Sequence, residues 1–382
     1  MNHFYLTNSQ VYASGRFIET AVTVGDGIIQ ALGAANKDKL PLIDGGGHFL
    51  IPGMIDPHTH GAVGIDCNQA RLQDFERLSA FFASHGTTGW LCSLAADSVD
   101  RTMRALETAA AVIRKGLPGA ELLGIHLEGP FLSPDYAGAL EKEHLLLPDR
   151  DLLERYRKSA GGHLLSLTLA PELPGAQEMI EVCRSQGIRV SLGHSGASWQ
   201  EARRALEAGA SSATHLGNAM RPMHHREPGI LGAALESDPY AELICDGHHL
   251  HPAFVRLVEG FKGPDRLMAV TDSIMAAGLG DGEFSMGQTP LRVEGGRALA
   301  RPGVLAGSTL TMDGALRNLS EMLGKGLEQL VPYVSTNAAR WLGLDHRKGL
   351  ILPGMDADLI LLDAYLSIQE VFCRGRACGR ME

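Results

Sequence analysis

Eight short apolar segments, most of them separated by helical stretches, constrain the fold of this 382-residue chain more than any other feature. A short apolar run that stops at a polar residue is typical of a buried strand. Eight βα repeats favour an α/β fold of the (β/α)8 TIM-like barrel type over an open doubly wound sheet, since no Gly-x-Gly-x-x-Gly follows the first strand. The predicted strands are 49–56, 86–94, 122–128, 164–171, 188–194, 212–215, 243–246 and 267–272.

The two ends of the chain have a different character. Residues 1–48 and 349–374 contain short β segments separated by turn signals such as Gly25-Asp26-Gly27 and Pro353-Gly354. Because two β-rich ends flank one long α/β middle, we expect them to pair with each other. The predicted domains are a small β domain made of residues 1–50 and 346–382, and a barrel domain over residues 51–345.

Composition and charge exclude several classes of protein. The net charge is −10 with no block of like charges, whereas a general nucleic-acid binder needs a basic face. No apolar run reaches the roughly 18 residues needed to span a bilayer, and the N-terminus lacks the pattern of a signal peptide. We therefore expect a cytoplasmic protein with neither a nucleic-acid nor a membrane partner.

Several predicted strands end in residues that could bind a metal or carry a proton. In a (β/α)8 barrel the C-terminal strand ends converge on one face, so such residues would meet despite their separation in sequence. One of them alone is more often a satisfied core residue, but a series of them predicts a metal site. These residues are His58, His60, Glu128, His194, His215 and Asp272.

The residue types indicate hydrolytic chemistry. His58 and His60, at positions i and i+2 of a strand, point to the same side, so both could reach one ion. A glutamate and two histidines leave a position open for water, as catalytic zinc-type sites do. Asp272 could move the proton of that water, or it could merely orient a neighbour. We expect one or two divalent ions, zinc first, with iron, cobalt, nickel or manganese as alternatives.

Two polar segments after the sixth and seventh strands are candidate substrate contacts. Arg226 could clamp a phosphate or carboxylate bidentately, or it could form a surface salt bridge. One of the histidines within residues 246–251 could bind a sugar hydroxyl or a phosphate, and a structural role is equally open for each of them.

These segments together resemble the amidohydrolase superfamily, and within it the N-acetylglucosamine-6-phosphate deacetylase family, over nearly the whole chain. The superfamily pattern is P-G-x-I-D-x-H-x-H at 52–60. The deacetylase patterns H-L-E-G-P at 126–130 and T-D-x-x-x-A-A-G at 271–278 are more specific. Further similar segments are L-G-H-S at 192–195, T-H-L-G-N-A-M at 214–220, R-E-P-G at 226–229, D-G-H-H at 246–249 and L-A-G-S-T-L-T-M at 305–312.

The resemblance implies a barrel with a small β-sandwich built from both termini, and hydrolysis of the N-acetyl amide of an amino sugar phosphate. Glu128, His194 and His215 would hold the principal ion. His58 and His60 would hold a second ion that shares Glu128, and Asp272 would be the general base and acid. A homodimer is the family expectation. The implied substrate contacts are Asn218, Ala219, Arg226, His249, Leu305, Ala306 and Ser308.

Two positions depart from the family pattern. Leu140 stands where the family commonly has a polar residue that helps to polarise the scissile carbonyl. This departure puts that step or the identity of the acyl group in question, and His144 is the candidate replacement. Gly217 stands where the family usually has a bulky aromatic residue, so we expect the pocket to be wider there.

Other functions are open at this point. Many cyclic amidases use a carboxylated lysine from the fourth strand, but residues 164–171 contain no lysine. A nucleobase deaminase would more often place His-x-x-Glu after the fifth strand, which His194-Ser195-Gly196-Ala197 does not match. A non-catalytic barrel scaffold would typically have lost metal ligands or the aspartate of the eighth strand, and this chain keeps them.

Overall fold

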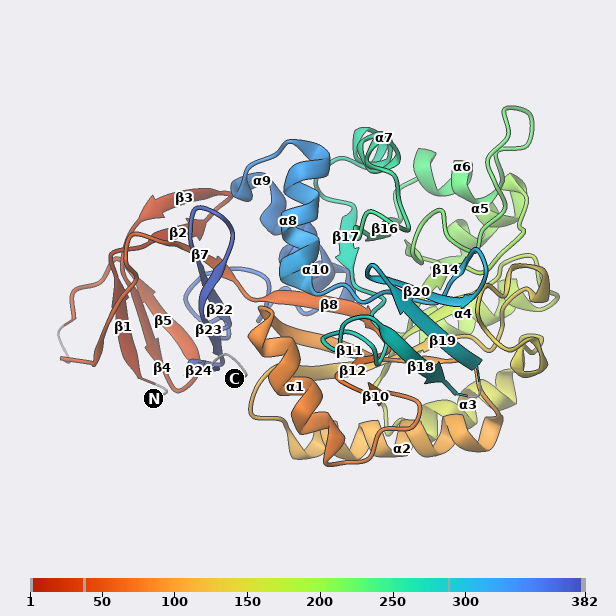
Figure 1. Cartoon of the computed structure of the whole chain (residues 1–382), viewed down its shortest axis with the longest axis horizontal. Coiled ribbons are helices and arrows are strands. Elements are labelled where there is room, and N and C mark those ends of the chain that lie inside the picture. Colours follow the sequence, from red (N-terminus) through yellow and green to blue (C-terminus); the bar gives the residue numbers. More distant parts are fainter. Residues whose placement is uncertain (1–2, 37–38, 288, 379–382) are drawn as a thin grey trace.

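A parallel eight-stranded sheet is the centre of the computed structural model, which describes residues 3–36, 39–287 and 289–378. Its strand order, β17-β16-β15-β14-β13-β12-β11-β8, follows the chain, and helices pack around its outside (Figure 1). The fold is the predicted (β/α)8 barrel. The strands are β8 (Met54–Thr59), β11 (Thr87–Ala95), β12 (Glu121–Glu128), β13 (Leu164–Leu169), β14 (Arg189–Leu192), β15 (Ser212–Ala213), β16 (Tyr240–Ile244) and β17 (Leu267–Val270).

The helices cover the barrel with amphipathic faces. In α2 (Val99–Lys115), for example, Leu106, Ala109 and Val112 are buried against the sheet, whereas charged residues face outward. Helix α5 (Trp199–Ala208) begins at a capping box in which Ser198 and Glu201 satisfy each other's backbone amides. The remaining helices are α1 (Asp74–Ser84), α3 (Arg150–Ser159), α4 (Ala176–Ser185), α6 (Gly229–Glu236), α7 (Pro252–Lys262), α8 (Met312–Leu323), α9 (Leu327–Val331) and α10 (Asn337–Leu342). No helix in the described part of the chain is long and apolar enough to cross a bilayer.

The first and last strands of the barrel are joined largely through one buried carboxylate. Asp56 on β8 accepts hydrogen bonds from the backbone N of Thr271 at 3.2 Å and from its Oγ1 at 2.6 Å. The backbone N of Asp272 donates to the carbonyl of His58 at 2.8 Å. This seam holds the end of β8 beside the end of β17.

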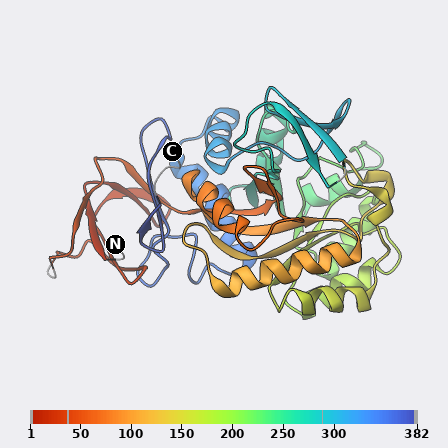
Figure 2. The ribbon, with the colours of Figure 1, turned by 60° about the horizontal axis from the view of Figure 1, so that its bottom comes forward.

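Strands from both termini form a β-sandwich beside the barrel (Figures 1 and 2). One sheet has the order β5-β4-β1-β6 and the other β24-β23-β22-β7-β2-β3, so strands from the two ends pair as predicted. Phe4, Leu50, Leu359 and Phe372 are buried in its core. The strands are β1 (Phe4–Thr7), β2 (Gln10–Ala13), β3 (Arg16–Glu19), β4 (Val22–Gly25), β5 (Ile28–Leu32), β6 (Leu42–Asp44), β7 (Phe49–Pro52), β22 (Leu359–Leu362), β23 (Ile368–Cys373) and β24 (Arg376–Ala377). The boundaries at 50/51 and 345/346 stay a prediction.

A group of buried and partly buried charges, the junction cluster, ties the barrel to this β-sandwich. It consists of Glu121, Arg347, Lys348, Asp356 and Asp358. The Nζ of Lys348 lies 2.8 Å from Glu121 and 2.9 Å from Asp356, and it also pairs with Asp358. Arg347 binds Glu121 at 2.7 Å and Asp356 at 2.5 Å.

Three expectations about the elements were wrong. Segment 49–56 belongs to two strands, because Gly53 separates β7 from β8. The chain passes close to Thr88 at Gly53, where an added Cβ would lie 2.0 Å from Thr88 Oγ1. Residues 349–352 form no strand. Residues 282–305 form an antiparallel lobe that we did not predict, with strands β18 (Gly282–Met286), β19 (Thr289–Glu294), β20 (Arg297–Arg301) and β21 (Val304–Leu305). Two further short strands are β9 (Gly61–Ala62) and β10 (Ile65–Asp66).

Candidate active site

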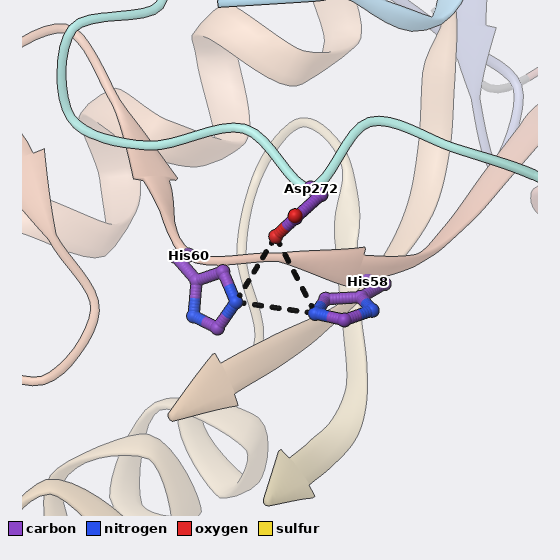
Figure 3. A group of neighbouring side chains, drawn as sticks. All are labelled: His58, His60 and Asp272. Atoms are coloured by element: carbon purple, nitrogen blue, oxygen red, sulfur yellow. Dashed lines mark hydrogen bonds and ion pairs between the residues drawn. The ribbon is translucent and has the colours of Figure 1, made fainter. Parts of the chain in front are cut away.

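Two groups of buried ligand-type side chains meet at the C-terminal ends of the barrel strands, as the sequence predicted. His58, His60 and Asp272 form the first group (Figure 3). Glu128, His194 and His215 form the second. Within each group, one potential ligand atom per residue lies within 4.8 Å of the others.

In the first group, the two imidazoles face each other and the carboxylate. The Nε2 atoms of His58 and His60 are 3.1 Å apart, and Oδ1 of Asp272 is 3.5 Å from the former and 3.2 Å from the latter (Figure 3). His58 lies in β8, and His60 directly follows that strand. Asp272 follows β17, the last strand of the barrel, which lies beside β8.

Glu128, the last residue of β12, lies between the two groups. Its Oε1 is 3.0 Å from Nε2 of His194 and 3.1 Å from Nε2 of His215, and its Oε2 is 3.2 Å from Nε2 of His60. One carboxylate thus faces both groups.

The orientation of the rings suits a divalent cation. Paired Nε2 atoms approach to 3.1 Å in both groups, and two neutral imidazoles that present lone pairs to each other repel unless a cation or a proton lies between them. Nδ1 of His194 donates to the carbonyl of Tyr136 at 2.9 Å, which leaves its Nε2 free as a ligand. Imidazole and carboxylate donors in this arrangement fit zinc and other first-row divalent metals.

Two buried residues that support the site were missed by sequence reasoning. Glu242 on β16 accepts a hydrogen bond from Nδ1 of His58 at 3.0 Å and faces the backbone N of His215 at 3.3 Å. His126 on β12 lies between Ser93 and Thr168, and burial lowers its pKa well below the usual value, so it is neutral. A glutamate inside the otherwise apolar strand β16 was the available signal for the first.

Charge in the first group also indicates a cation. Burial alone would lower the pKa of His58, but the carboxylates of Asp272, Glu242 and Glu128 raise it to about 9. The excess of carboxylates therefore attracts positive charge to this point, and protons satisfy it when no ion does.

Three strand-end residues have left-handed backbone conformations. The φ angles are 47° at His194, 28° at His215 and 48° at Asp272. Non-glycine residues rarely adopt positive φ, and such strain is concentrated at functional sites. The sharp turn after each strand directs these side chains into the mouth of the barrel.

A pocket of about 290 Å³ opens over both groups and contains most of the predicted substrate contacts. Asn218, Ala219, His249, Leu305 and Ala306 line it. Its other wall is formed by loop 138–140 and by the lobe of β18–β21, which contributes Met286, Gly303 and Val304.

Two predicted contacts lie outside this lining. Arg226 is in an exposed loop, where its Nη1 contacts Nε2 of His225 at 2.9 Å. Ser308 is buried beneath the site, and its hydroxyl donates to the carbonyl of Thr271 at 2.5 Å. Ser308 therefore supports the segment that carries Asp272 instead of facing the cavity.

The two departures from the family pattern have different outcomes. Leu140 lines the pocket, whereas His144 is beyond it and lies 3.3 Å from Glu141 and 3.6 Å from Asp97. The widening expected at Gly217 is not found, because Phe254 of α7 fills the space: a Cβ on Gly217 would lie 3.1 Å from two ring carbons.

Known proteins resemble this chain along almost all its length. N-acetylglucosamine-6-phosphate deacetylase of Bacillus subtilis is 40% identical over 330 residues, which cover 85% of this chain and 83% of that protein. The enzyme of the same name from Lysinibacillus sphaericus is 36% identical over 96% of this chain and 95% of its own. N-acetylgalactosamine-6-phosphate deacetylase of Escherichia coli O157:H7 is 33% identical over 98% and 99%.

Solved structures agree with these sequence relatives. An N-acetyl-D-glucosamine-6-phosphate deacetylase mutant from Mycobacterium smegmatis, in complex with N-acetyl-D-glucosamine-6-phosphate, has a TM-score of 0.92 and 32% identity, covering 99% of this chain and 100% of its own. The Thermotoga maritima deacetylase gives 0.90 and 33% over the same shares. The sequence profile of the amidohydrolase family matches residues 49–378. By sequence and by structure, this chain belongs to the amidohydrolase family, alongside its N-acetylglucosamine-6-phosphate deacetylases.

Proposed function

We propose that this protein hydrolyses the N-acetyl amide of an N-acetylhexosamine 6-phosphate, releasing acetate and the amino sugar phosphate. The observation that carries the proposal is Glu128 placed between two pairs of histidines, with Asp272 beside them at the base of one pocket. The named relatives at 33 to 40% identity support this substrate class.

Asp272 is the proton carrier in this proposal. Its carboxylate lies 3.2 Å from Nε2 of His60, and His58 and His60 lower its pKa although burial alone would raise it. The ionised carboxylate can take a proton from the attacking water and deliver it to the amide nitrogen as the C–N bond breaks. Its backbone N donates to the carbonyl of His58 and its carbonyl accepts a hydrogen bond from the backbone N of Ser308, and both bonds hold it in position.

The metal ligands in this proposal are Glu128 and the four histidines of the two groups, His58, His60, His194 and His215. Glu128, His194 and His215 would hold the principal ion, and His58 and His60 a second, with zinc as the first candidate. A divalent ion held there polarises the scissile carbonyl and lowers the pKa of water. Replacing both His58 and His60 with alanine should remove one metal equivalent, which elemental analysis of the purified protein would detect.

On the sugar side, Asn218 and His249 offer polar groups to the hydroxyls and the phosphate. His249 is held by Asp246, whose carboxylate lies 2.6 Å from its Nδ1. Arg226 stays a predicted phosphate contact, although its loop is outside the pocket in this chain. The homodimer and the cytoplasmic location likewise stay predictions from the sequence.

Amine release from a panel of sugars tests the function. We expect turnover of N-acetylglucosamine 6-phosphate or N-acetylgalactosamine 6-phosphate, the second because of the galactosamine-specific relative. The unphosphorylated sugars should react much more slowly, and a chelator should abolish turnover until zinc is restored. Equal turnover of phosphorylated and neutral sugars would show that the site makes no important contact with the phosphate. Absence of turnover with every sugar in the panel would contradict the proposed function.

A further inference from the structure

A second, smaller cavity of about 40 Å³ opens beside the metal ligands, on the side of His60. Four apolar or small residues, Ala95, Ala139, Leu140 and Met286, line both this cavity and the main pocket. The site therefore has two arms that meet next to His60, a wide one and a narrow one, and these four residues form the apolar part of the narrow arm. We call the narrow arm the side arm.

The walls of the side arm are held firmly. Asn68 pairs with both backbone groups of Ala95, donating to its carbonyl at 2.9 Å and accepting from its N at 3.0 Å. On the opposite wall, Arg301 of β20 donates to the carbonyl of Gly138 at 3.1 Å, which fixes the loop that carries Leu140. Hydrogen bonds thus hold the backbone on both walls of the side arm.

The shape of a secondary amide indicates which part of the substrate occupies each arm. A secondary amide is planar and trans, so the group on nitrogen and the group on the carbonyl carbon extend in opposite directions. A hexosamine phosphate is far too large for a cavity of about 40 Å³ and must occupy the pocket of about 290 Å³. With the carbonyl at the metal ligands, the acyl group then points into the side arm.

We propose that the side arm is an acyl-binding subsite that accepts saturated acyl groups of three or four carbons, with Leu140 as the specificity-determining residue. The proposal rests on the deacetylase function above. A space for one water needs roughly 10 to 15 Å³ on this measure, so a cavity of about 40 Å³ has room for carbons beyond the acetyl methyl. The leucine side chain provides apolar contact for them.

Charged and polar side chains that also line the side arm limit the length of the acyl chain that it can accept. Asp97, Arg101 and His144 line it, and they pair with one another: Arg101 lies 3.5 Å and His144 3.6 Å from Oδ1 of Asp97. An apolar chain that reached these groups would separate them, at a cost in unpaired charge. Chains much longer than butyryl are therefore excluded.

The test compares N-formyl, N-acetyl, N-propionyl, N-butyryl and N-hexanoyl glucosamine 6-phosphate, with kcat/KM measured from release of the free amine. We expect the wild-type values for propionyl and butyryl to lie within about 10-fold of the value for acetyl, and the hexanoyl value to fall well below them. One methylene in an apolar pocket is worth roughly 10-fold or more. Leu140→Phe, which fills the side arm, and Leu140→His, which makes it polar, should each lower the butyryl-to-acetyl ratio by at least about 10-fold.

The matched controls are Leu147→Phe and Leu147→His, the same changes at a leucine of the same loop that is 60% exposed. They should leave the ratio unchanged. If the wild type hydrolyses only the N-acetyl substrate, or if neither Leu140 variant alters the butyryl-to-acetyl ratio, the acyl-subsite proposal is wrong while the deacetylase function stands. Absence of amine release from every sugar phosphate overturns both.

Discussion

Two clusters of charged groups in this molecule, the junction cluster and the active site, differ in how their charges are neutralised. In the junction cluster the cations of Arg347 and Lys348 pair with three carboxylates at 2.5 to 2.9 Å. In the active site, imidazole nitrogens and carboxylates converge, and the described residues of the two ligand groups and of the main pocket include no lysine or arginine. Each charged group of the junction cluster has a partner of opposite charge within the chain, whereas the active-site cluster needs a cation from outside. Buried charge is therefore a mark of function only where its neutralising partner is not part of the chain.

The largest expected effect comes from the active-site cluster. Asp272→Asn should lower kcat by about 10²- to 10⁴-fold, because the amide cannot accept the proton of the attacking water. Elemental analysis should find the metal content unchanged. The control is Asp265→Asn, at a residue whose side chain is 67% exposed and pairs with Arg340. Turnover that survived the change at Asp272 would assign the proton transfer to another group.

The junction cluster should respond in stability instead. Lys348→Met removes the cation that pairs with the buried Asp358 and with the partly buried Glu121 and Asp356, and it should lower the free energy of unfolding by about 3 to 5 kcal/mol. Urea denaturation measures this loss, and Lys115→Met, at an exposed residue paired with Glu76, should cost less than about 1 kcal/mol. An equal loss in both variants would show that the cluster is not a structural tie.

The pH dependence of the junction cluster sharpens the contrast. Burial alone would raise the pKa of Glu121, but Arg347 and Lys348 lower it to about 2. A carboxyl group with a lowered folded-state pKa stabilises the protein above its unfolded value near 4.5, and this stability disappears as the pH falls through 2. The stability difference between wild type and Glu121→Gln should thus shrink by roughly 2 to 3 kcal/mol between pH 5 and pH 2. A constant difference in urea titrations would contradict the assigned pKa.

The smallest expected effect is at Glu242, which contacts the active-site cluster through Nδ1 of His58. Glu242→Gln weakens the charge-assisted hydrogen bond that orients His58, and it should lower the affinity for the ion at His58 and His60 by about 10- to 100-fold. Competition with a chelator measures this affinity. Glu236→Gln, at the exposed end of α6, is the control. Unchanged affinity for both ions would limit Glu242 to a packing role.

The sequence was informative where periodic topology fixes position. Once eight repeats implied a barrel, His58, Glu128, His194, His215 and Asp272 had to meet, because the strand ends of a barrel share one face. Contacts between side chains of distant strands could not be predicted in this way. Glu242 on β16 reaches His58 on β8 past the intervening strand β17, and no local pattern in the sequence records this contact.

The lobe of β18–β21 was missed for a related reason. Its alternating residues and the turn at Gly295-Gly296 are ordinary hairpin signals, but they follow the eighth barrel strand, where the repeat pattern has ended. The lobe nevertheless forms one wall of the pocket through Met286 and Val304. Walls contributed by insertions depend on how the insertion folds back, and spacing along the chain does not specify that.

The close approach of Gly217 to the ring of Phe254 restricts the order in which these two positions can change. A bulky residue at Gly217 would meet the Phe254 ring and would also be strained at its φ of 94°. Replacing Phe254 first would leave a cavity in the wall. Each single step is therefore unfavourable, although the exchange of the two residues conserves volume. We expect the effects of substitutions at the two positions to be coupled, so a substitution that is tolerated in a relative can be harmful here.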